Sequence, residues 1–139
     1  MTEAAAANGT HITVLMPVKH YHPRYLRESV ASITQQSSSD WQLLVIAEPQ
    51  DHDHFAALLH GALADPRARL VANEGRKLAG AINTGMRHAR TGFVALLLAD
   101  DLWATDAVRA LSAYIDSHPD VDFFHTSRRI IDESGNAIS

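Results

Sequence analysis

The sequence contains no cysteine, which excludes disulfide bonds and metal sites built from thiolates. No apolar run approaches the length of about 20 residues that a membrane-spanning helix requires. No block of lysine and arginine is present and the formal net charge is −4, so a nucleic-acid-binding surface is not indicated. There is no glycine-rich phosphate loop ending in Lys-Ser or Lys-Thr, and no Gly-x-Gly-x-x-Gly follows the first predicted strand. These absences argue against P-loop enzymes and dinucleotide-binding folds.

The composition is that of a soluble globular domain. Of the 139 residues, 46% are hydrophobic and 20% are charged, so the chain has the size of one domain and can bury a core. Residues 1–10 lack the basic start and long apolar centre of a secretory signal, and we interpret them as a flexible tail. We expect residues 11–139 to form a single domain, with a cytoplasmic location as the default prediction.

Strand-like and helix-like segments alternate along the chain. Runs of β-branched and apolar residues predict five strands, at residues 11–17, 41–47, 69–72, 93–98 and 121–126. Apolar residues at helical spacing predict four helices, one starting around Pro23 and three covering residues 51–63, 76–90 and 104–117. Residues 130–138 indicate the start of a hairpin around Ser134 and Gly135. The alternation predicts a three-layer α/β/α fold with a mainly parallel sheet.

Two segments carry specific expectations about burial. The apolar run 94–99 is short and continuous, which predicts a central strand buried on both faces. The helix over residues 76–90 is expected to bury four apolar residues, Leu78, Ile82, Met86 and Ala89. Its small residues 79–81 would let it lie close to the sheet, and we expect Asn83 to link it to a neighbouring loop.

Two adjacent carboxylates, Asp100 and Asp101, follow the apolar run directly. Neighbouring carboxylates repel each other when they lose water without compensation, and a hard divalent cation would relieve that repulsion. The pair could equally end the strand and cap the helix that is expected to begin near Ala104. The local sequence leaves both interpretations open.

The predicted strands should bring several polar groups to one edge of the sheet. In open parallel α/β sheets, ligands bind just beyond the carboxyl ends of the strands. Those ends lie here at residues 17–20, 47–49, 72–73 and 99–101, and they supply acidic, basic and backbone groups together. This combination favours a ligand that carries phosphate and a metal over an apolar ligand.

Four segments, in order along nearly the whole chain, resemble the nucleotide-sugar-binding half of the family 2 glycosyltransferases. They are residues 12–18 followed by 25–36, residues 41–48, residues 78–86 with Ala89 and Arg90 beyond them, and residues 99–101. The resemblance implies a Rossmann-like GT-A fold that is truncated at the C-terminus. It also implies an inverting transferase that moves a sugar from a nucleotide-diphosphate sugar to a glycan or lipid-linked acceptor, in polysaccharide or cell-surface glycan synthesis.

The resemblance also implies site residues. It places Pro17, Val18 and Glu48 at the nucleoside, and Arg76 and Lys77 near the phosphates; surface charge is the alternative role for Glu48, Arg76 and Lys77. The whole implied nucleotide-binding set is Pro17, Val18, Lys19, Glu48, Arg76, Lys77 and Asp100. Asp100 and Asp101 match the end of the family's Asp-x-Asp motif, which implies bound Mn²⁺ or Mg²⁺.

The chain departs from the family pattern at several positions. Leu98 stands where the motif's first aspartate is usual, Glu48 lies in an Ala-Glu-Pro sequence where Asp-Asp or Asp-Gly is usual, and Lys77 replaces a common glycine. The family's general base would lie beyond Ser139, so no residue here is assigned that role. Two alternatives stay open: a non-catalytic nucleotide-sugar-binding or interaction module, and a fragment of a longer transferase whose unpaired sheet edge favours a homodimer.

Overall fold

A computed structural model of the chain describes residues 10–138 and contains a four-stranded sheet in the order β3-β2-β1-β4. The strands are β1 (Ile12–Val18), β2 (Trp41–Ala47), β3 (Ala68–Ala72) and β4 (Phe93–Leu96). Every neighbouring pair is parallel, which confirms the predicted sheet type. The predicted flexible tail lies outside the described residues except for Thr10.

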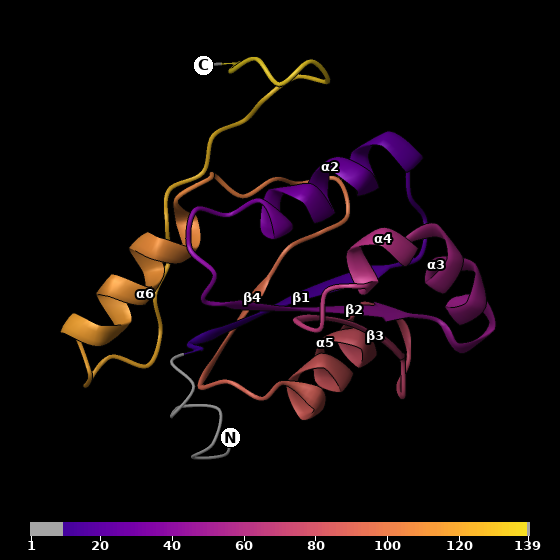
Figure 1. The fold of residues 1–139 in the computed structure, drawn as a ribbon, viewed down its shortest axis with the longest axis horizontal. Helices are drawn as coiled ribbons and strands as arrows, with labels where there is room; N and C mark the ends of the chain where they lie inside the picture. The colour runs from indigo at the N-terminus through magenta and orange to yellow at the C-terminus, as the bar shows by residue number, and fades with distance from the viewer. Residues whose placement is uncertain (1–9, 139) are drawn as a thin grey trace.

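Helices cover both faces of this sheet, which confirms the three-layer α/β/α arrangement (Figure 1). They are α2 (Pro23–Thr34), α3 (His52–Leu58), α4 (His60–Leu63), α5 (Lys77–His88) and α6 (Ala107–Ser117), with a short 3₁₀ turn η1 (Pro49–Asp51). Successive side chains of β1 point to opposite faces of the sheet, because the strand is pleated, and so they contact the two helical layers in turn. Val14 and Met16 pack with α2 and α3, whereas Leu15 packs with Ala81 of α5.

The first helix forms as the sequence predicts. Pro23 occupies its first turn, where a missing backbone N–H costs nothing. Leu26, Val30 and Ile33 recur at helical spacing and are all buried against the sheet. The helix is thus fixed by one apolar stripe.

Helix α5 uses a different face from the one that the sequence predicts. Its buried residues are Gly80, Ala81, Thr84 and Gly85, whereas Leu78 and Met86 remain 49% and 56% exposed. Small side chains let the helix axis approach the sheet closely, and that contact outweighs burial of the larger apolar residues. The prediction of a close approach is right, and the predicted buried face is wrong.

Two other predicted helices differ in their bounds. The helix expected over 51–63 is divided into η1, α3 and α4, because Leu59 leaves the helical region at φ −100° and ψ 17°. Phe55 and Leu59 still bury their side chains against the sheet. The helix expected from Ala104 begins at Ala107.

Strand β4 lies at an edge of the described sheet, so the prediction of a central strand buried on both faces is wrong. It ends at Leu96, and its burial alternates along the chain. Val94 and Leu96 are 39% and 45% exposed because α5 packs over β1 and β2 and does not extend over β4. The face of β4 that carries Phe93 and Ala95 packs against the core shared with α6.

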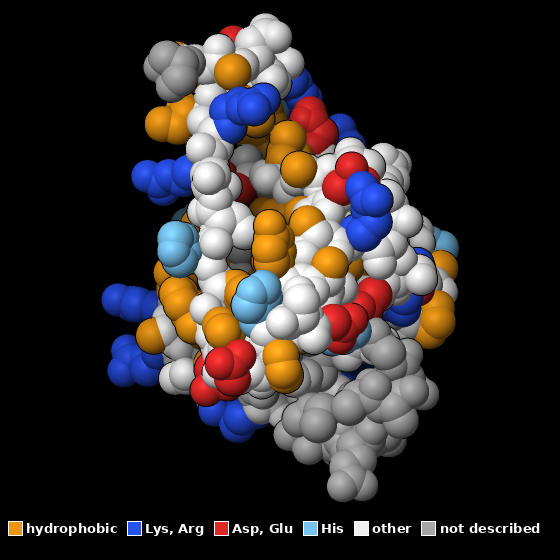
Figure 2. Space-filling view, turned by 90° about the vertical axis from the view of Figure 1, so that its left-hand side faces the viewer, with side chains coloured by type: hydrophobic (Ala, Val, Ile, Leu, Met, Phe, Trp, Pro, Cys, Tyr) orange, Lys and Arg blue, Asp and Glu red, His pale blue; other side chains and the backbone are white. Residues whose placement is uncertain are grey.

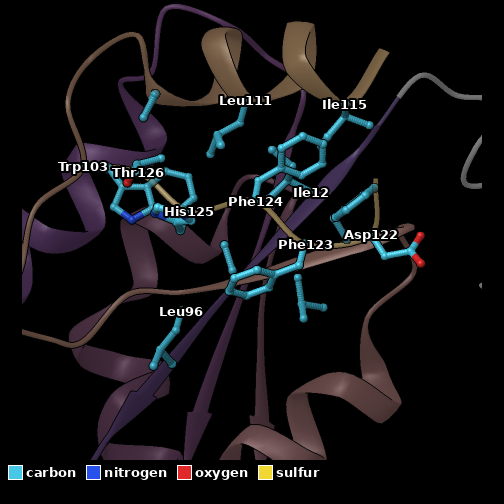
Figure 3. A pocket seen from close by; sticks show the side chains of 14 residues that line it. Ile12, Leu96, Trp103, Leu111, Ile115, Asp122, Phe123, Phe124, His125 and Thr126 are labelled. Carbon is cyan, nitrogen blue, oxygen red and sulfur yellow. The ribbon is translucent and has the colours of Figure 1, made fainter. Parts of the chain in front are cut away.

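The predicted fifth strand is also absent from the described residues. Residues 121–130 make no ladder with β4; instead Phe124 packs its ring 5.7 Å from that of Phe93, centroid to centroid. This ring contact lies at a cleft of about 370 Å³ between β4, α6 and residues 122–126 (Figure 3). The predicted hairpin is confirmed as one antiparallel bridge, Ile131 with Ala137.

Hydrophobic side chains gather around this cleft, on the side of the molecule that Figure 2 shows. Phe123, which lines the cleft, is 79% exposed, and the β4 residues Val94 and Leu96, which also line it, are exposed as well. The unpaired edge of β4 is therefore bordered by exposed apolar residues.

Within residues 10–138, no helix is both long enough and apolar enough to cross a membrane.

A histidine ties α6 to the amino end of the sheet. Nδ1 of His11 lies 2.5 Å from Oδ2 of Asp40, and its Nε2 lies 2.8 Å from Oδ1 of Asp116 on α6. The Ser112 hydroxyl donates to Asp40 from the same helix, at 2.8 Å. Burial alone lowers the pKa of His11, but the hydrogen bonds to both carboxylates outweigh it and raise the pKa above its ordinary 6.5.

Candidate functional site

The carboxyl ends of three strands meet in register at one rim of the sheet. Val18 lies opposite Ala47, and Ala47 lies opposite Ala72. Strand β4 runs in the same direction and leads into residues 97–101 at the same rim, with the Leu97 N–H donating to the Leu15 carbonyl at 3.0 Å. The rim therefore gathers residues from all four loops that follow the strands.

Lys19 and Glu48 come together at this rim. Nζ of Lys19 lies 3.8 Å from Oε1 of Glu48, and the lysine side chain is half exposed. Pro17 is half-buried, and the Val18 side chain is buried in the core. Val18 can therefore offer a ligand only its backbone groups.

Asn73 joins Glu48 to the loop that precedes α5. Its side-chain amide donates to Oε2 of Glu48 and to the Lys77 carbonyl, both at 3.1 Å. Its side-chain oxygen accepts from the Gly75 N–H at 2.9 Å. The sequence places Asn73 at this rim because it ends the third strand, yet nothing in the sequence alone indicates that it contacts Glu48.

Lys77 adopts a left-handed backbone conformation, with φ 57°. Residues other than glycine rarely adopt it, because the β-carbon crowds the backbone. This explains why glycine is common at this position in the family that the sequence resembles. Arg76 precedes it as the exposed N-cap residue of α5, and within the described residues its side chain has no hydrogen bond or ion pair.

Thr84, rather than the predicted Asn83, links α5 to the loop. The Glu74 N–H donates to the Thr84 hydroxyl at 2.9 Å, and that hydroxyl donates to the Gly80 carbonyl at 2.8 Å. Asn83 is exposed on the helix surface. Hydrogen bonds from His88 and Arg87 lower the pKa of Glu74 and direct its carboxylate along α5.

Asp100 and Asp101 are exposed in the turn beyond β4. The Asp101 N–H donates to the Leu98 carbonyl at 3.0 Å, and the Asp101 carbonyl accepts from the buried hydroxyl of Ser29 on α2. The turn is thus anchored by backbone groups, which leaves both carboxylates facing solvent. The alternative role as a helix cap is wrong, because the residue that precedes α6 is Asp106.

The two aspartates fit a metal that a phosphate ligand also coordinates. Among residues 10–138, no group of three or more His, Asp or Glu side chains is arranged to hold a metal ion. Mg²⁺ is commonly bound through one or two carboxylates together with substrate phosphates, and Asp100 and Asp101 supply that number. Leu98 is 38% exposed and offers no oxygen. The structure does not bring their carboxylates into contact with Lys19 or Glu48, which lie on other loops of the rim.

Known proteins that are similar to this chain include the following three. The uncharacterized protein y4gI of Sinorhizobium fredii is 33% identical over 92% of this chain and 14% of its own length. The UDP-Glc:alpha-D-GlcNAc-diphosphoundecaprenol beta-1,3-glucosyltransferase WfgD of Escherichia coli is 33% identical over 66% of this chain and 36% of its own. The mannosyltransferase PcManGT of Pyrobaculum calidifontis, solved with GDP-Man and Mn²⁺, superposes with a TM-score of 0.60 and 27% identity, over 73% of this chain and 31% of that one.

The chain therefore spans between 14% and 36% of the length of these proteins. Its mainly parallel sheet with helices superposes on structural relatives that have the GT-A fold. The family model described as glycosyl transferase family 2 matches residues 13–138, which is most of the chain. On this match and this fold, the chain belongs to glycosyl transferase family 2.

Proposed function

We propose that the chain is the nucleotide-sugar-binding part of an inverting glycosyltransferase. It would take a sugar from a nucleotide-diphosphate donor for transfer to a glycan or lipid-linked acceptor, in polysaccharide or cell-surface glycan synthesis. One observation carries the proposal: Lys19, Glu48, Asn73 and the backbone carbonyl of Lys77 form one connected cluster at the rim where Asp100 and Asp101 also emerge. Cations and carboxylates together at that rim suit a nucleoside diphosphate with its metal.

The cluster suggests a role for each member of the predicted nucleotide-binding set. Glu48 is a fixed acceptor for a hydrogen bond from the base or the ribose, and the backbone at Pro17 and Val18 forms the adjoining wall. Lys19, Arg76 and Lys77 are exposed cations in the loops around Glu48, and in this proposal they bind the diphosphate.

Asp100 and Asp101 are the residues that would hold Mn²⁺ or Mg²⁺. When bound, the ion neutralises the negative charge on the leaving diphosphate. The Ser29 hydroxyl fixes the backbone between the aspartates and α2, so the turn that presents them is held by a buried residue. Support for the metal comes from the Mn²⁺ in the structurally similar mannosyltransferase.

Isothermal titration with UDP and GDP, each with and without Mn²⁺, tests the proposal. We expect saturable binding of at least one nucleotide, strengthened by Mn²⁺. Glu48→Gln should weaken the binding by at least about tenfold, because it removes the charged acceptor. Glu133→Gln makes the same change at an exposed residue outside the rim and should leave the affinity as it is. Absence of heat with both nucleotides would contradict the proposal.

A non-catalytic nucleotide-sugar-binding module is the second candidate, and Leu98 favours it. An apolar residue replaces the first carboxylate of the metal motif, which reduces the oxygen ligands available to an ion. This candidate predicts nucleotide binding without turnover. Sugar transfer or donor hydrolysis by the purified chain would exclude it.

Self-association and location stay predictions. The unpaired edge of β4, bordered by exposed apolar residues, favours a homodimer. Light scattering across a range of concentrations tests this, and a monomer at every concentration would contradict it. A cytoplasmic location is likewise a prediction.

A further inference from the structure

The side chain of Asn73 makes hydrogen bonds through both its amide nitrogen and its oxygen at the rim. It is 6% exposed, and its amide nitrogen makes two hydrogen bonds, to Glu48 and to the Lys77 carbonyl. Its side-chain oxygen accepts from the Gly75 N–H at 2.9 Å. Both donors of the amide group and one of its acceptor sites are therefore in use. Such a side chain has one orientation.

The backbone of Asn73 is fixed to the strand that leads to Glu48. Its N–H donates to the carbonyl of Ala47, the residue before Glu48, at 2.7 Å. The side chain and the backbone of Asn73 thus both hold the end of β2. Glu48 consequently receives a directional hydrogen bond of 3.1 Å from a rigid donor, whereas its contact with Lys19 is a longer one, of 3.8 Å, to a half-exposed flexible cation.

The same amide nitrogen also supports the unusual backbone of Lys77. Its hydrogen bond to the Lys77 carbonyl lies at the residue whose φ is 57°. A strained conformation persists only where its surroundings hold it. One side chain therefore couples the carboxylate of Glu48 to the backbone of the loop that carries Arg76 and Lys77.

We propose that Asn73 is a positioning residue, which orients the Glu48 carboxylate and the backbone at Lys77 and thereby sets the affinity for the nucleotide. The inference rests on the proposed function of this rim. It goes further because it assigns the affinity of that site to a buried amide. Asn73 would act on the ligand only through the Glu48 carboxylate and the backbone at Lys77. A purely structural Asn73 would change stability without changing affinity in the folded protein.

Asn73→Asp is the sharpest test, because it keeps the shape and the acceptor oxygen but replaces the donor with a second acceptor. Aspartate would face Glu48 and the Lys77 carbonyl without a proton to share, and the two carboxylates would repel. We expect binding of UDP or GDP with Mn²⁺, measured near pH 7.5, to weaken by at least about tenfold. Lowering the pH should restore part of the affinity, because a proton shared between the two carboxylates recreates a donor.

Two further variants separate positioning from folding. Asn73→Ser retains an oxygen for the Gly75 N–H but cannot reach Glu48, so it should fold and still lose affinity. Glu48→Gln combined with Asn73→Asp exchanges donor and acceptor; it should recover the stability lost in the single Asn73→Asp variant without recovering nucleotide binding. Asn83→Asp is the control, because it makes the same chemical change at an exposed position of α5.

The outcomes are distinct. Weakened binding in folded Asn73→Ser, with wild-type affinity in Asn83→Asp, supports the inference. Wild-type affinity in folded Asn73→Ser or Asn73→Asp overturns it while the proposed function stands. If the unaltered chain binds neither UDP nor GDP with Mn²⁺, the proposed function fails and the inference is overturned with it.

Discussion

Gly85 of α5 lies so close to Leu15 of β1 that a β-carbon added to the glycine would come within 2.9 Å of both Leu15 methyl carbons. The nearest methyl carbon of Ile46 would be 3.2 Å away. Real β-carbon contacts are longer than 3 Å, so a side chain at this position would displace either the buried Leu15 side chain or the helix. The spacing between α5 and the sheet therefore depends on a missing side chain.

Gly85→Ala should lower the free energy of unfolding by about 1–3 kcal/mol, the cost of overpacking a core. Urea denaturation followed by circular dichroism measures this change. Gly61→Ala is the matched control, since nothing lies within 4 Å of the β-carbon it would add in α4. Alanine there should leave stability unchanged or raise it by up to about 1 kcal/mol. Equal effects of the two substitutions would contradict the close packing of α5.

The bridge from His11 to Asp40 and Asp116 predicts a stability contribution that depends on pH. The pKa of His11 is raised in the folded protein, so the protonated form stabilises the fold. That contribution is fully present below the unfolded pKa of 6.5 and is lost as the pH rises through the higher folded value. The free energy of unfolding, measured with urea, should therefore be lower in His11→Asn than in the wild type, and by more at about pH 5.5 than at about pH 8.5.

His60→Asn provides the control for this measurement, because His60 is exposed on α4 and far along the chain from the bridge. The free energies of unfolding of His60→Asn and the wild type should differ little at both pH values. A His11→Asn difference that stays constant or grows toward high pH would show that protonated His11 does not hold α6 to the sheet.

The left-handed backbone at Lys77 predicts an unusual order of stabilities. Lys77→Gly should be at least as stable as the wild type, because glycine adopts φ 57° without strain. Lys77→Val should lose about 1–3 kcal/mol, because a β-branched residue tolerates this region poorly. Thermal unfolding of both variants tests the order. A valine variant as stable as the glycine variant would contradict the strain.

The two rim aspartates predict how the protein responds to metal. Asp100→Asn and Asp101→Asn should each reduce the strengthening of nucleotide binding by Mn²⁺ by at least about tenfold. Leu98→Asp should increase the strengthening of nucleotide binding by Mn²⁺, because the half-exposed leucine occupies the position of the missing carboxylate. Calorimetric titration of UDP and GDP at several Mn²⁺ concentrations measures both changes. Aspartate variants with unchanged Mn²⁺ dependence would place any metal elsewhere.

The sequence pattern predicts an element correctly where that element packs on a single neighbouring surface. The stripe of Leu26, Val30 and Ile33 predicts α2 correctly, because a helix with a single apolar face has one way to cover a sheet. The parallel strands and their common rim follow from the alternation of elements. The positions of Glu48 and of Asp100 at that rim are therefore predictable from sequence order.

The sequence pattern predicts burial incorrectly where burial of a strand depends on which other element packs over it. The run 94–99 has the composition of a buried strand, but burial requires a helix over Val94 and Leu96, and α5 lies over β1 and β2. Residues 121–126 have strand propensity but pair with no strand in the described fold. Asn73 was also beyond prediction, since its hydrogen bond to Glu48 joins loops that are 25 residues apart.

The placement of β4 has a consequence for how the fold accommodates change. Its free edge lies on the far side of β1 from the loops that carry Glu48 and Asn73. Additional strands or a different neighbour at that edge would leave the amide-carboxylate pair untouched. The amide-carboxylate pair is therefore separated from a change at that edge, whereas Asp100 and Asp101 lie in the turn that follows β4 and are adjacent to it.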